Sequence, residues 1–183
     1  RNPAWSRDGK WIAFDSRPTS TAQIYLVAAG GGSPRAWTSG PHAHLDPVWS
    51  EDGKWIYFTS NRTGRYEVFR SPAPKSPVSR VSYEQITTEG GASPRISPDG
   101  QVVIFRGRDG ACYRMDAREK KVAQLPRGFI VPPLVGQGTQ LYGYYADAPV
   151  GYVVRYEWLT EKVERLARVD FSRPIGLAQS PDR

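Results

Sequence analysis

The chain has 183 residues, of which 39% are hydrophobic and 12% aromatic, enough for an ordered globular domain with a sizeable core. Its formal net charge is +7, and it has no apolar run of about 18 residues, which excludes a membrane-spanning helix. The single cysteine, Cys112, excludes an internal disulfide framework and a site with several cysteine ligands, so we expect a buried packing residue.

The positive charge is concentrated in one part of the chain. Residues 93–132 carry a net charge of +4, while residues 1–46, 47–92 and 133–183 carry +2, +1 and 0. Charges that alternate along exposed strands and loops are typical of a solvated surface. We therefore expect no direct nucleic-acid binding by this segment, although a pI near 9.7 raises that question.

The chain enters a repeated pattern at Pro3. The run from Pro3 to Ser16 reads Pro-Ala-Trp-Ser-Arg-Asp-Gly-Lys-Trp-Ile-Ala-Phe-Asp-Ser. Its Ser-x-Asp-Gly element predicts a tight turn between antiparallel strands, because serine and aspartate bond nearby amides and glycine supplies a positive φ. A third strand is predicted at Gln23–Val27 and a fourth at Ala36–Thr38, on either side of a glycine-rich turn.

The connection to the next repeat, residues 39–46, holds both histidines of the protein. In an extended His-x-His-x-Asp run, His42, His44 and Asp46 place their side chains on one side, so a metal site is one hypothesis. The alternative is that these are ordinary loop residues, since no fourth ligand is evident in the sequence. We expect no cofactor elsewhere in the chain.

A near copy of the first run begins at Pro47 and forms the clearest repeat. Residues 71–80 of this repeat include three prolines, which predicts an exposed, extended loop. Four short runs rich in aromatic and β-branched residues predict four strands, and four strands in one repeat are typical of a propeller blade. The predicted strands are Pro47–Ser50, Trp55–Ser60, Tyr66–Ser71 and Glu84–Thr88.

Two further copies follow. The third begins at Pro94, and the fourth, near Pro133, has lost the Ser-Pro-Asp-Gly element. The prolines of the first three copies lie 44 and then 47 residues apart, a period that indicates a solenoid or a propeller. The predicted strands of these copies are Val102–Phe105, Ala111–Asp116, Lys121–Leu125, Gln140–Tyr145, Tyr152–Leu159 and Lys162–Arg168.

We therefore predict an all-β fold, a β-propeller of four-stranded antiparallel blades that occupies residues 1–183 as a single domain. Four blades and the first strand of a fifth predict a segment of a larger ring, and a closed four-bladed ring is the alternative. An open segment exposes apolar blade faces, so self-association is expected. The repeats are predicted at approximately 3–46, 47–93, 94–132 and 133–173, with a fifth starting at 174.

Acidic residues recur at fixed positions of the repeats, at Asp8, Asp52 and Asp99. A catalytic pair of carboxylates needs two different environments that separate their pKa values, whereas these three lie in equivalent turns. The sequence also has no Gly-x-Ser-x-Gly elbow or comparable nucleophile motif. We therefore expect that the chain is not an enzyme.

The run from Trp5 to Phe14 and its copies resemble the TolB-like, or WD-like, β-propeller repeat of bacteria. The similarity is strong over the first three copies and loose over the fourth. It implies a ring of about six to eight blades that acts as a non-catalytic sensor or scaffold, with a protein or peptide partner and no membrane insertion. More narrowly, Ile12–Arg17, Trp55–Arg62, and Arg165–Ala167 followed by Ser180–Asp182 resemble the propeller half of bacterial regulators with an N-terminal winged-helix DNA-binding domain. This resemblance implies that the chain is a fragment of a longer protein.

Two other functions stay open. Propellers of this repeat type also form the gating domain of prolyl-oligopeptidase-like serine peptidases, and a downstream hydrolase domain would decide for that role. A periplasmic TolB-like adaptor that binds a peptide in the central channel is the other. The resemblance favours the periplasm, and the residues themselves do not exclude the cytoplasm.

Arginines recur three or four residues after the phenylalanine of each of the first three repeats. Arg17, Arg62 and Arg108 are expected at equivalent positions on one rim, where their donors suit an acidic or carboxylate-bearing partner. Arg65 joins them as a candidate binding residue. The alternative is that all four are ordinary exposed turn residues. The loops expected to make contacts are Ser16–Ala22, Ser60–Arg65 and Arg106–Gly110.

Overall fold

The described part of the chain is β-structure. The computed structural model describes residues 1–74, 81–129, 134–135, 140–147 and 150–169. These residues form four sheets of four strands each, with antiparallel pairing in all of them and no helix. The predicted all-β class with four-stranded antiparallel blades is confirmed.

Each sheet consists of four consecutive strands and is called a blade below. Blade 1 contains β1 (Ala4–Trp5), β2 (Trp11–Ser16), β3 (Gln23–Ala28) and β4 (Arg35–Ala36). Blade 2 contains β5 (His44–Trp49), β6 (Trp55–Ser60), β7 (Glu67–Pro72) and β8 (Glu84–Gln85). Blade 3 contains β9 (Ala92–Ile96), β10 (Val102–Arg106), β11 (Cys112–Asp116) and β12 (Val122–Gln124), and blade 4 contains β13 (Leu134–Val135), β14 (Gln140–Asp147), β15 (Val150–Glu157) and β16 (Lys162–Val169).

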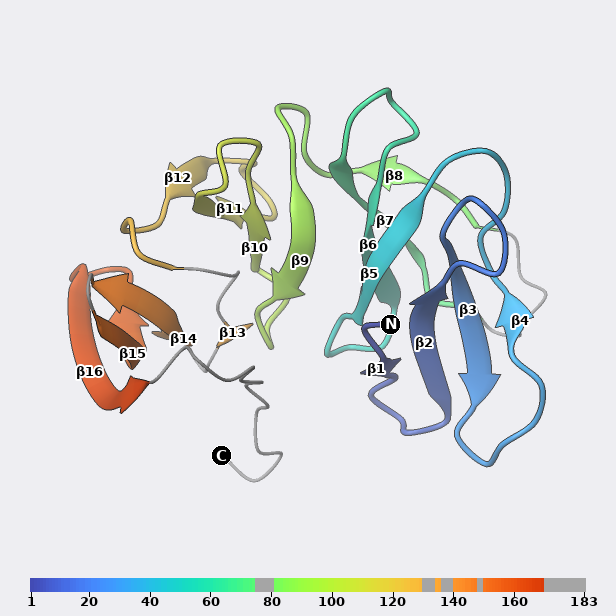
Figure 1. Cartoon of the computed structure of the whole chain (residues 1–183), viewed down its shortest axis with the longest axis horizontal. Coiled ribbons are helices and arrows are strands. Elements are labelled where there is room, and N and C mark those ends of the chain that lie inside the picture. Colours follow the sequence, from blue (N-terminus) through green and yellow to red (C-terminus); the bar gives the residue numbers. More distant parts are fainter. Residues whose placement is uncertain (75–80, 130–133, 136–139, 148–149, 170–183) are drawn as a thin grey trace.

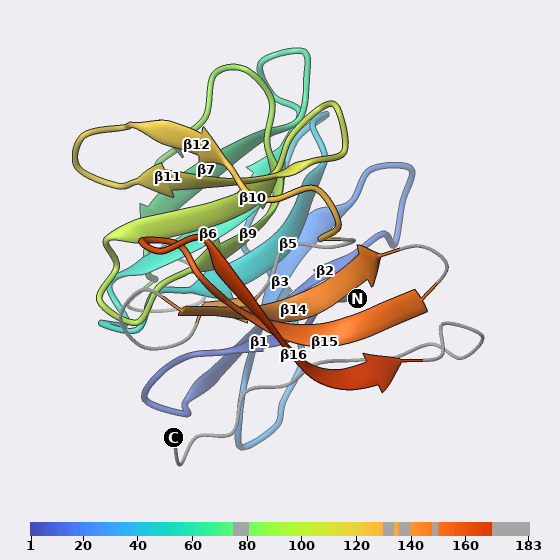
Figure 2. The same cartoon turned by 90° about the vertical axis from the view of Figure 1, so that its left-hand side faces the viewer.

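The first strand of each blade lies on the inside of the arrangement. In Figure 1, β1, β5, β9 and β13 follow one another near the middle, and neighbours in this series are in contact. The fourth strands, β4, β8, β12 and β16, lie on the outside (Figure 1). The view turned by 90° shows β14, β15 and β16 side by side in blade 4 (Figure 2). This inside-to-outside order of strands is that of a propeller.

The Ser-x-Asp-Gly element forms the first turn of blades 1 to 3. In blade 2 the hydroxyl of Ser50 donates to Oδ1 of Asp52 (2.6 Å), and the N–H of Gly53 donates to the Ser50 carbonyl (2.9 Å). The equivalent bonds form around Ser6 in blade 1 and around Ser97 in blade 3. The predicted turn chemistry is confirmed, and it accounts for the recurring aspartates.

The glycine of this turn is expected to be sensitive to substitution. Gly53→Ala should lower the free energy of unfolding by about 1–2 kcal/mol, because an L-residue is strained in the left-handed region. Gly53 has a φ of 67°, and a Cβ added there would meet no atom of the described residues within 4 Å, so backbone strain is the expected cost. Gly30→Ala is the matched control, since Gly30 has the same open space without a positive φ. Urea unfolding followed by tryptophan fluorescence compares the two, and equal losses would contradict the argument.

In blades 1 to 3 a residue with a positive φ stands immediately before the proline at the start of the repeat. In blade 2 the pairing of β5 with β6 shifts register around Asp46, which has a φ of 52°. Ser93 in blade 3 and Asn2 in blade 1 hold the same place, with φ values of 52° and 48°. The bulge carries the proline past the hydrogen-bond ladder. As a result β5 begins at His44, rather than at Pro47 as predicted.

The side chains at these positions link neighbouring blades. The side-chain amide of Asn2 donates to Oδ1 of Asp46 (2.6 Å), and the Ser93 hydroxyl donates to Oδ2 of the same carboxylate (2.9 Å). Asn2 also donates to Oδ1 of the buried Asp15 (3.0 Å). One carboxylate thus fixes the inner edges of blades 1, 2 and 3 to one another.

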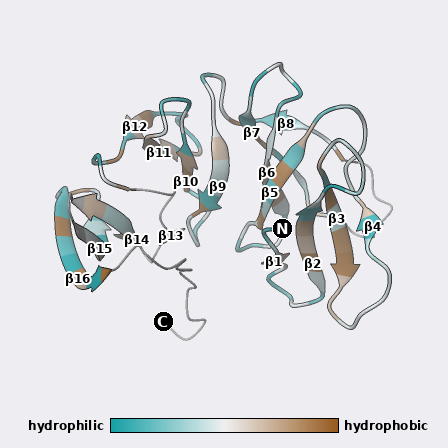
Figure 3. Ribbon diagram, in the orientation of Figure 1, coloured by the Kyte–Doolittle hydropathy of each residue, from teal (hydrophilic) through white to brown (hydrophobic). Residues whose placement is uncertain are grey.

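The hydrophobic core lies between the blades. Alternate residues of β6 face opposite neighbours, so that Ile56 and Phe58 pack with blade 1 and Tyr57 packs with blade 3. A hydrophobic stretch also runs along β3, brown in Figure 3, whose Ile24 and Leu26 belong to the core shared with blade 2. Strand β6 is thus covered by a neighbouring blade on each of its faces.

Blades 3 and 4 share a third hydrophobic cluster. Cys112 is 3% exposed and belongs to this cluster with Leu141 and Val154, and burial raises the pKa of its thiol to about 11. This confirms Cys112 as a packing residue. The strands β14 and β15 are longer than predicted toward the turn that joins them, pairing as far as Asp147 with Val150.

Three predicted features lie outside the described residues: the start of the fourth repeat at Pro133, the fifth repeat from residue 174, and residues 75–80 of the proline-rich loop. The loop was predicted to begin at residue 71, but Ser71 and Pro72 belong to β7 and Ser71 is buried. Within the described ranges, no helix has the length and apolarity needed to cross a membrane.

Candidate binding surface

The four candidate arginines lie in the predicted loops, after β2, β6 and β10, but their environments differ. Arg17 is exposed and lines a depression of about 290 Å³ together with Asp15 and Leu45. This is the exposed rim position that the sequence predicts.

Arg62 has an aromatic partner instead of an exposed position. Its guanidinium carbon lies 3.5 Å from the centre of the Tyr83 ring and 5.9 Å from that of Phe69, an arrangement typical of cation–π contacts. Its Nη1 is buried and has no hydrogen-bond partner among the described residues. Arg62 therefore contributes to the packing of blade 2 and does not offer a free donor on the rim.

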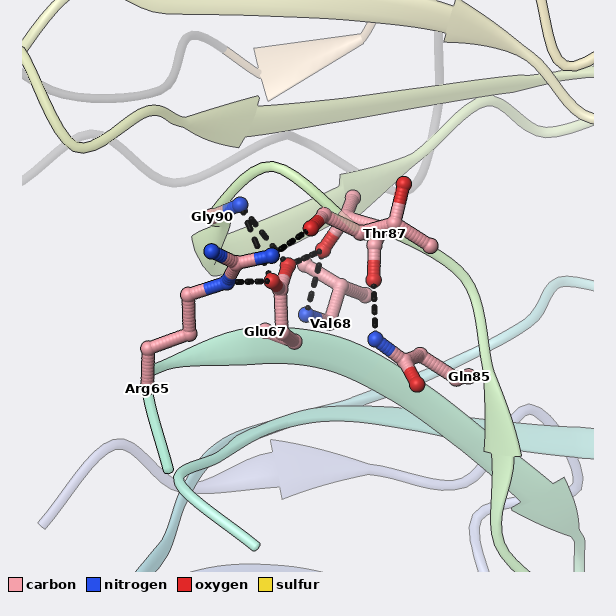
Figure 4. A network of polar contacts seen from close by, with 7 residues as sticks. Arg65, Glu67, Val68, Gln85, Thr87 and Gly90 are labelled. Atoms are coloured by element: carbon pink, nitrogen blue, oxygen red, sulfur yellow. Dashed lines mark hydrogen bonds and ion pairs between the residues drawn. The ribbon is translucent and has the colours of Figure 1, made fainter. Parts of the chain in front are cut away.

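Arg65 belongs to a buried polar network around Glu67 (Figure 4). Glu67 is 0% exposed, and its carboxylate accepts from Nε of Arg65 (2.7 Å), from the hydroxyl of Thr87 (2.6 Å) and from the N–H of Gly90 (3.0 Å). Arg65 also donates to the carbonyl of Thr88. A desolvated carboxylate is stable only when it is paired in this way. The network ties the segment after β8 to strand β7.

Arg108 reaches the same segment from blade 3. Its side chain lies across Gly90, where an added Cβ would collide with Cγ of Arg108. Gly90 has a φ of 100°, so both its backbone conformation and its missing side chain are needed here. Arg65 and Arg108 thus both contact the segment between β8 and β9. The contacts that the structure shows for Arg17 and Arg62 lie elsewhere.

A groove of about 640 Å³ lies at this junction of blades 2 and 3, and we call it the 2–3 groove. Its volume is within the range of ligand-binding clefts, and its lining is mostly apolar with a few charged groups, as such clefts commonly are. Residues of both blades line it: Gln85, Ile86, Thr87, Thr88, Glu89, Gly90, Phe105, Gly107, Arg108, Asp109, Tyr113, Met115, Lys120 and Val122.

The charged groups of the 2–3 groove differ in their pairing. Asp109 accepts from the hydroxyl of Tyr113 (2.8 Å) and from the N–H of Ala111 (3.0 Å), which lowers the pKa of Asp109, and the first bond raises the pKa of Tyr113. Arg108 and Lys120 form no ion pair with any residue in the described ranges. The groove therefore presents two unpaired cations.

Glu67 and Lys120 are absent from the sequence-based candidates. Glu67 occupies an ordinary position in an alternating strand, and its burial depends on Thr87 and Gly90, which follow it only after the proline-rich loop. Lys120 is one of several basic residues in the third repeat, and only the folding of β12 against the groove distinguishes it. The sequence feature that points toward Lys120 is the net charge of +4 over residues 93–132.

The structure does not gather the predicted metal ligands. His42 is exposed, whereas His44 is 2% exposed and packs against the rings of Phe58 (5.8 Å) and Tyr83 (5.4 Å). Asp46 binds side chains from both neighbouring blades, and its bulge breaks the strand alternation on which the hypothesis depended. Among the residues that the structure describes, no group of three or more His, Cys, Asp and Glu side chains could hold a metal ion.

The burial of His44 predicts a pH-dependent stability. Burial lowers the pKa of His44 from 6.5 to about 4, and the positive charges of Arg62 and His42 act in the same direction. As the pH falls below 6.5, the unfolded chain binds this proton before the folded chain does, so stability is lost progressively down to about pH 4. The expected loss is on the order of 2 kcal/mol.

Urea titrations at stepped pH values measure this dependence. His44→Gln should remove this part of the slope, whereas the exposed His42→Gln should keep it. A slope that is unchanged in His44→Gln would show that another group is responsible.

Residues 1–132 match the protein-family model described as the TolB beta propeller domain. The chain belongs to the TolB β-propeller domain family. The match covers the strands of blades 1 to 3, including every residue that lines the 2–3 groove, while β13 to β16 of this TolB propeller chain lie beyond it. A comparison with curated protein sequences found no match.

Solved structures share the fold of this TolB propeller chain. TolB from Acinetobacter baumannii is 20% identical with a TM-score of 0.70, over 85% of this chain and 40% of that one. A putative TolB from Agrobacterium tumefaciens is 23% identical with a TM-score of 0.72, over 92% of this chain and 65% of that one. A puromycin-hydrolysing peptidase from Mycobacterium tuberculosis is 21% identical with a TM-score of 0.64, over 91% of this chain and 28% of that one. The chain spans less than two thirds of each of these structures.

Proposed function

We propose that this TolB-like propeller segment is a non-catalytic binding module that holds a protein partner in the bacterial periplasm. The family match and the likeness to two TolB structures support a periplasmic adaptor role. Propellers are rigid scaffolds, and their function resides in the loops and grooves that the blades hold in place.

The single observation that carries this proposal is the 2–3 groove. Its wall is held by the buried Glu67, which pairs with the half-exposed Arg65, and its lining is largely apolar. Its two cations, Arg108 and Lys120, have no ion-pair partner in the described residues. These features suit recognition of another molecule. The recurring aspartates Asp8, Asp52 and Asp99, in contrast, accept bonds from their own turns, which leaves them no evident role in chemistry.

Site-specific photo-cross-linking in cells tests the proposal. A benzophenone amino acid is placed in the full natural protein at Arg17, Lys54 or Lys120, which are exposed and lie in different surface depressions. A binding module should give a discrete cross-linked protein from at least one of these positions, while the very exposed Leu159 on blade 4 serves as the control. Illumination that yields no adduct at any of the three positions would contradict the proposal.

A second candidate is the gating propeller of a prolyl-oligopeptidase-like serine peptidase, in which this segment again performs no chemistry. The likeness to the mycobacterial peptidase over 91% of this chain favours it. A fluorophosphonate probe, which labels active serine hydrolases, distinguishes the two candidates when it is applied to the full natural protein. Labelling would favour the peptidase, and an unlabelled protein would favour the adaptor.

The narrower resemblance to winged-helix regulators stays a prediction. TolB proteins and a peptidase, not regulators, are the solved structures to which the fold is compared above. A DNA-binding domain in the full natural protein, and retardation of DNA by that protein but not by this chain, would be needed to support it.

A further inference from the structure

We propose that the 2–3 groove binds an extended acidic peptide, with an apolar side chain of the peptide in the groove and its carboxylates on Arg108 and Lys120. This inference rests on the proposed binding function and specifies the chemistry of the partner. Three features of the groove lead to it: a fixed wall, an apolar lining and two cations without an ion-pair partner among the described residues.

The wall of the groove is fixed before any ligand arrives. The segment between β8 and β9 has no regular structure, yet Thr87 and Gly90 both donate to the buried Glu67, and Thr87 also accepts from the N–H of Val68 (2.8 Å). Gly91 packs so closely on Thr87 that an added Cβ would collide with the threonine hydroxyl. A wall that is already ordered loses little conformational entropy on binding.

The apolar lining offers contact area to one or two side chains. Ile86 from blade 2 and Phe105 and Met115 from blade 3 form the buried floor of the groove. Val122, which is 50% exposed on the outer strand β12, forms an apolar edge. An apolar side chain of a ligand that covers Val122 would remove apolar surface of both from water, a gain that the exposed valine does not have in the free protein.

The groove is lined by two cations, Arg108 and Lys120, and by two carboxylates, Glu89 and Asp109, of which Asp109 already accepts bonds from Tyr113 and Ala111. The unpaired cations suit the carboxylates of an acidic partner. Arg108 and Lys120 are both exposed and unpaired within the described ranges, and the repeat that carries them has a net charge of +4. In a second depression, between the first turns of blades 1 and 2, Lys10 and Lys54 lie instead beside Asp8 and Asp52 (3.8 and 3.7 Å). Of these two surfaces, only the 2–3 groove leaves its cations for a ligand.

The acidic groups of the groove argue against a polyanion such as nucleic acid. Glu89 lines the groove without an ion-pair partner among the described residues, and it would repel a chain of phosphates. A peptide can place its carboxylates on Arg108 and Lys120 and an uncharged residue beside Glu89. Gln85 of the outer strand β8 and Val122 of the outer strand β12 both line the groove, so an extended peptide bound there would run beside two sheet edges.

Selection from a library of random short peptides, displayed on phage and presented to this chain, provides the probe. We expect enrichment of peptides that combine Asp or Glu with at least one Leu, Ile, Phe or Met. Fluorescence anisotropy with an enriched, dye-labelled peptide then gives the dissociation constant for the wild-type chain and for each variant.

Two pairs of variants test the two halves of the site. The charge reversal Arg108→Glu with Lys120→Glu should weaken peptide binding by about tenfold or more, because attraction becomes repulsion. The control Arg118→Glu with Lys121→Glu makes the same change of charge at exposed residues outside the groove, and should change binding less than about twofold. Val122→Asp should also weaken binding, whereas Leu159→Asp, on the exposed end of blade 4, should not.

The outcomes separate this inference from the proposed function. If enriched peptides bind the Arg108→Glu, Lys120→Glu chain as tightly as the control Arg118→Glu, Lys121→Glu chain, the 2–3 groove is not the binding site. The proposal that the chain is a binding module would still stand. Enriched peptides without acidic residues would overturn the acidic chemistry. If this chain enriches no peptide and the full natural protein gives no cross-linked partner, both the acidic-peptide site and the proposed binding function are contradicted.

Discussion

Glu67→Ala is expected to lower the free energy of unfolding of the chain by about 3–5 kcal/mol. The substitution removes the acceptor of three donors that are held in place, the Arg65 guanidinium, the Thr87 hydroxyl and the Gly90 N–H. The hydroxyl and the amide are buried, and buried donors without a partner cost more than the bonds themselves contribute.

Urea unfolding measures this loss, and Glu84→Ala is the control. Glu84 forms a two-bond ion pair with Arg70 (2.8 Å for each bond), but its side chain is 45% exposed. An exposed pair of this kind contributes at most about 1 kcal/mol. Similar losses in the two variants would contradict the argument that burial makes the Glu67 network important.

The Glu67 network also connects stability with the proposed binding. Because Thr87 and Gly90 form part of the wall of the 2–3 groove, Glu67→Ala should weaken peptide binding even under conditions where the chain is folded. Glu84→Ala leaves that wall intact, since Glu84 does not line the groove. If a folded Glu67→Ala chain binds the peptide with unchanged affinity, then the Glu67 network is not needed for the binding conformation of the groove.

The fold was predictable from the sequence because its main determinants are local. The turn at Ser50, Asp52 and Gly53 uses only neighbouring residues, so its bonds follow directly from the motif. The start of β5 was not predictable in the same way. It depends on a bulge at Asp46, and that bulge is held by Asn2 and Ser93 from the neighbouring blades.

The candidate site was predictable only in part, because equal spacing in a repeat does not produce equal environments. Arg17 and Arg62 follow their phenylalanines at similar distances along the chain, yet Arg62 is stacked on Tyr83, which follows the proline-rich loop. Arg65 is drawn toward the buried Glu67 by contacts across blade 2. Arg108 alone of these four lines the 2–3 groove.

Phe58→Ala is the other change with a large expected effect, a loss of about 3–5 kcal/mol in the free energy of unfolding. Phe58 is 0% exposed, and its ring lies about 6 Å from the rings of Trp37, His44, Tyr83 and Phe69. The substitution leaves a cavity at the junction of blades 1 and 2, and rings from both blades lose their contacts. Denaturant unfolding measures the loss.

The equivalent residue of blade 1 provides a matched comparison. Phe14 stacks on Tyr25 as Phe58 stacks on Phe69, with 5.9 and 6.3 Å between the ring centres. Phe14 is only partly buried, and Trp5 on the first strand of the same blade is 59% exposed, because no described blade covers this face. Phe14→Ala should therefore cost only about 1–2 kcal/mol in this chain.

A longer natural protein in which another blade covers blade 1 would change this comparison. The cost of Phe14→Ala should then rise toward that of Phe58→Ala, since the same stacked pair would be buried on both faces. In this chain the open face predicts self-association, which Phe14→Asp should reduce in light scattering. If Phe14→Ala costs the same in the long and the short protein, then no further blade covers that face of blade 1.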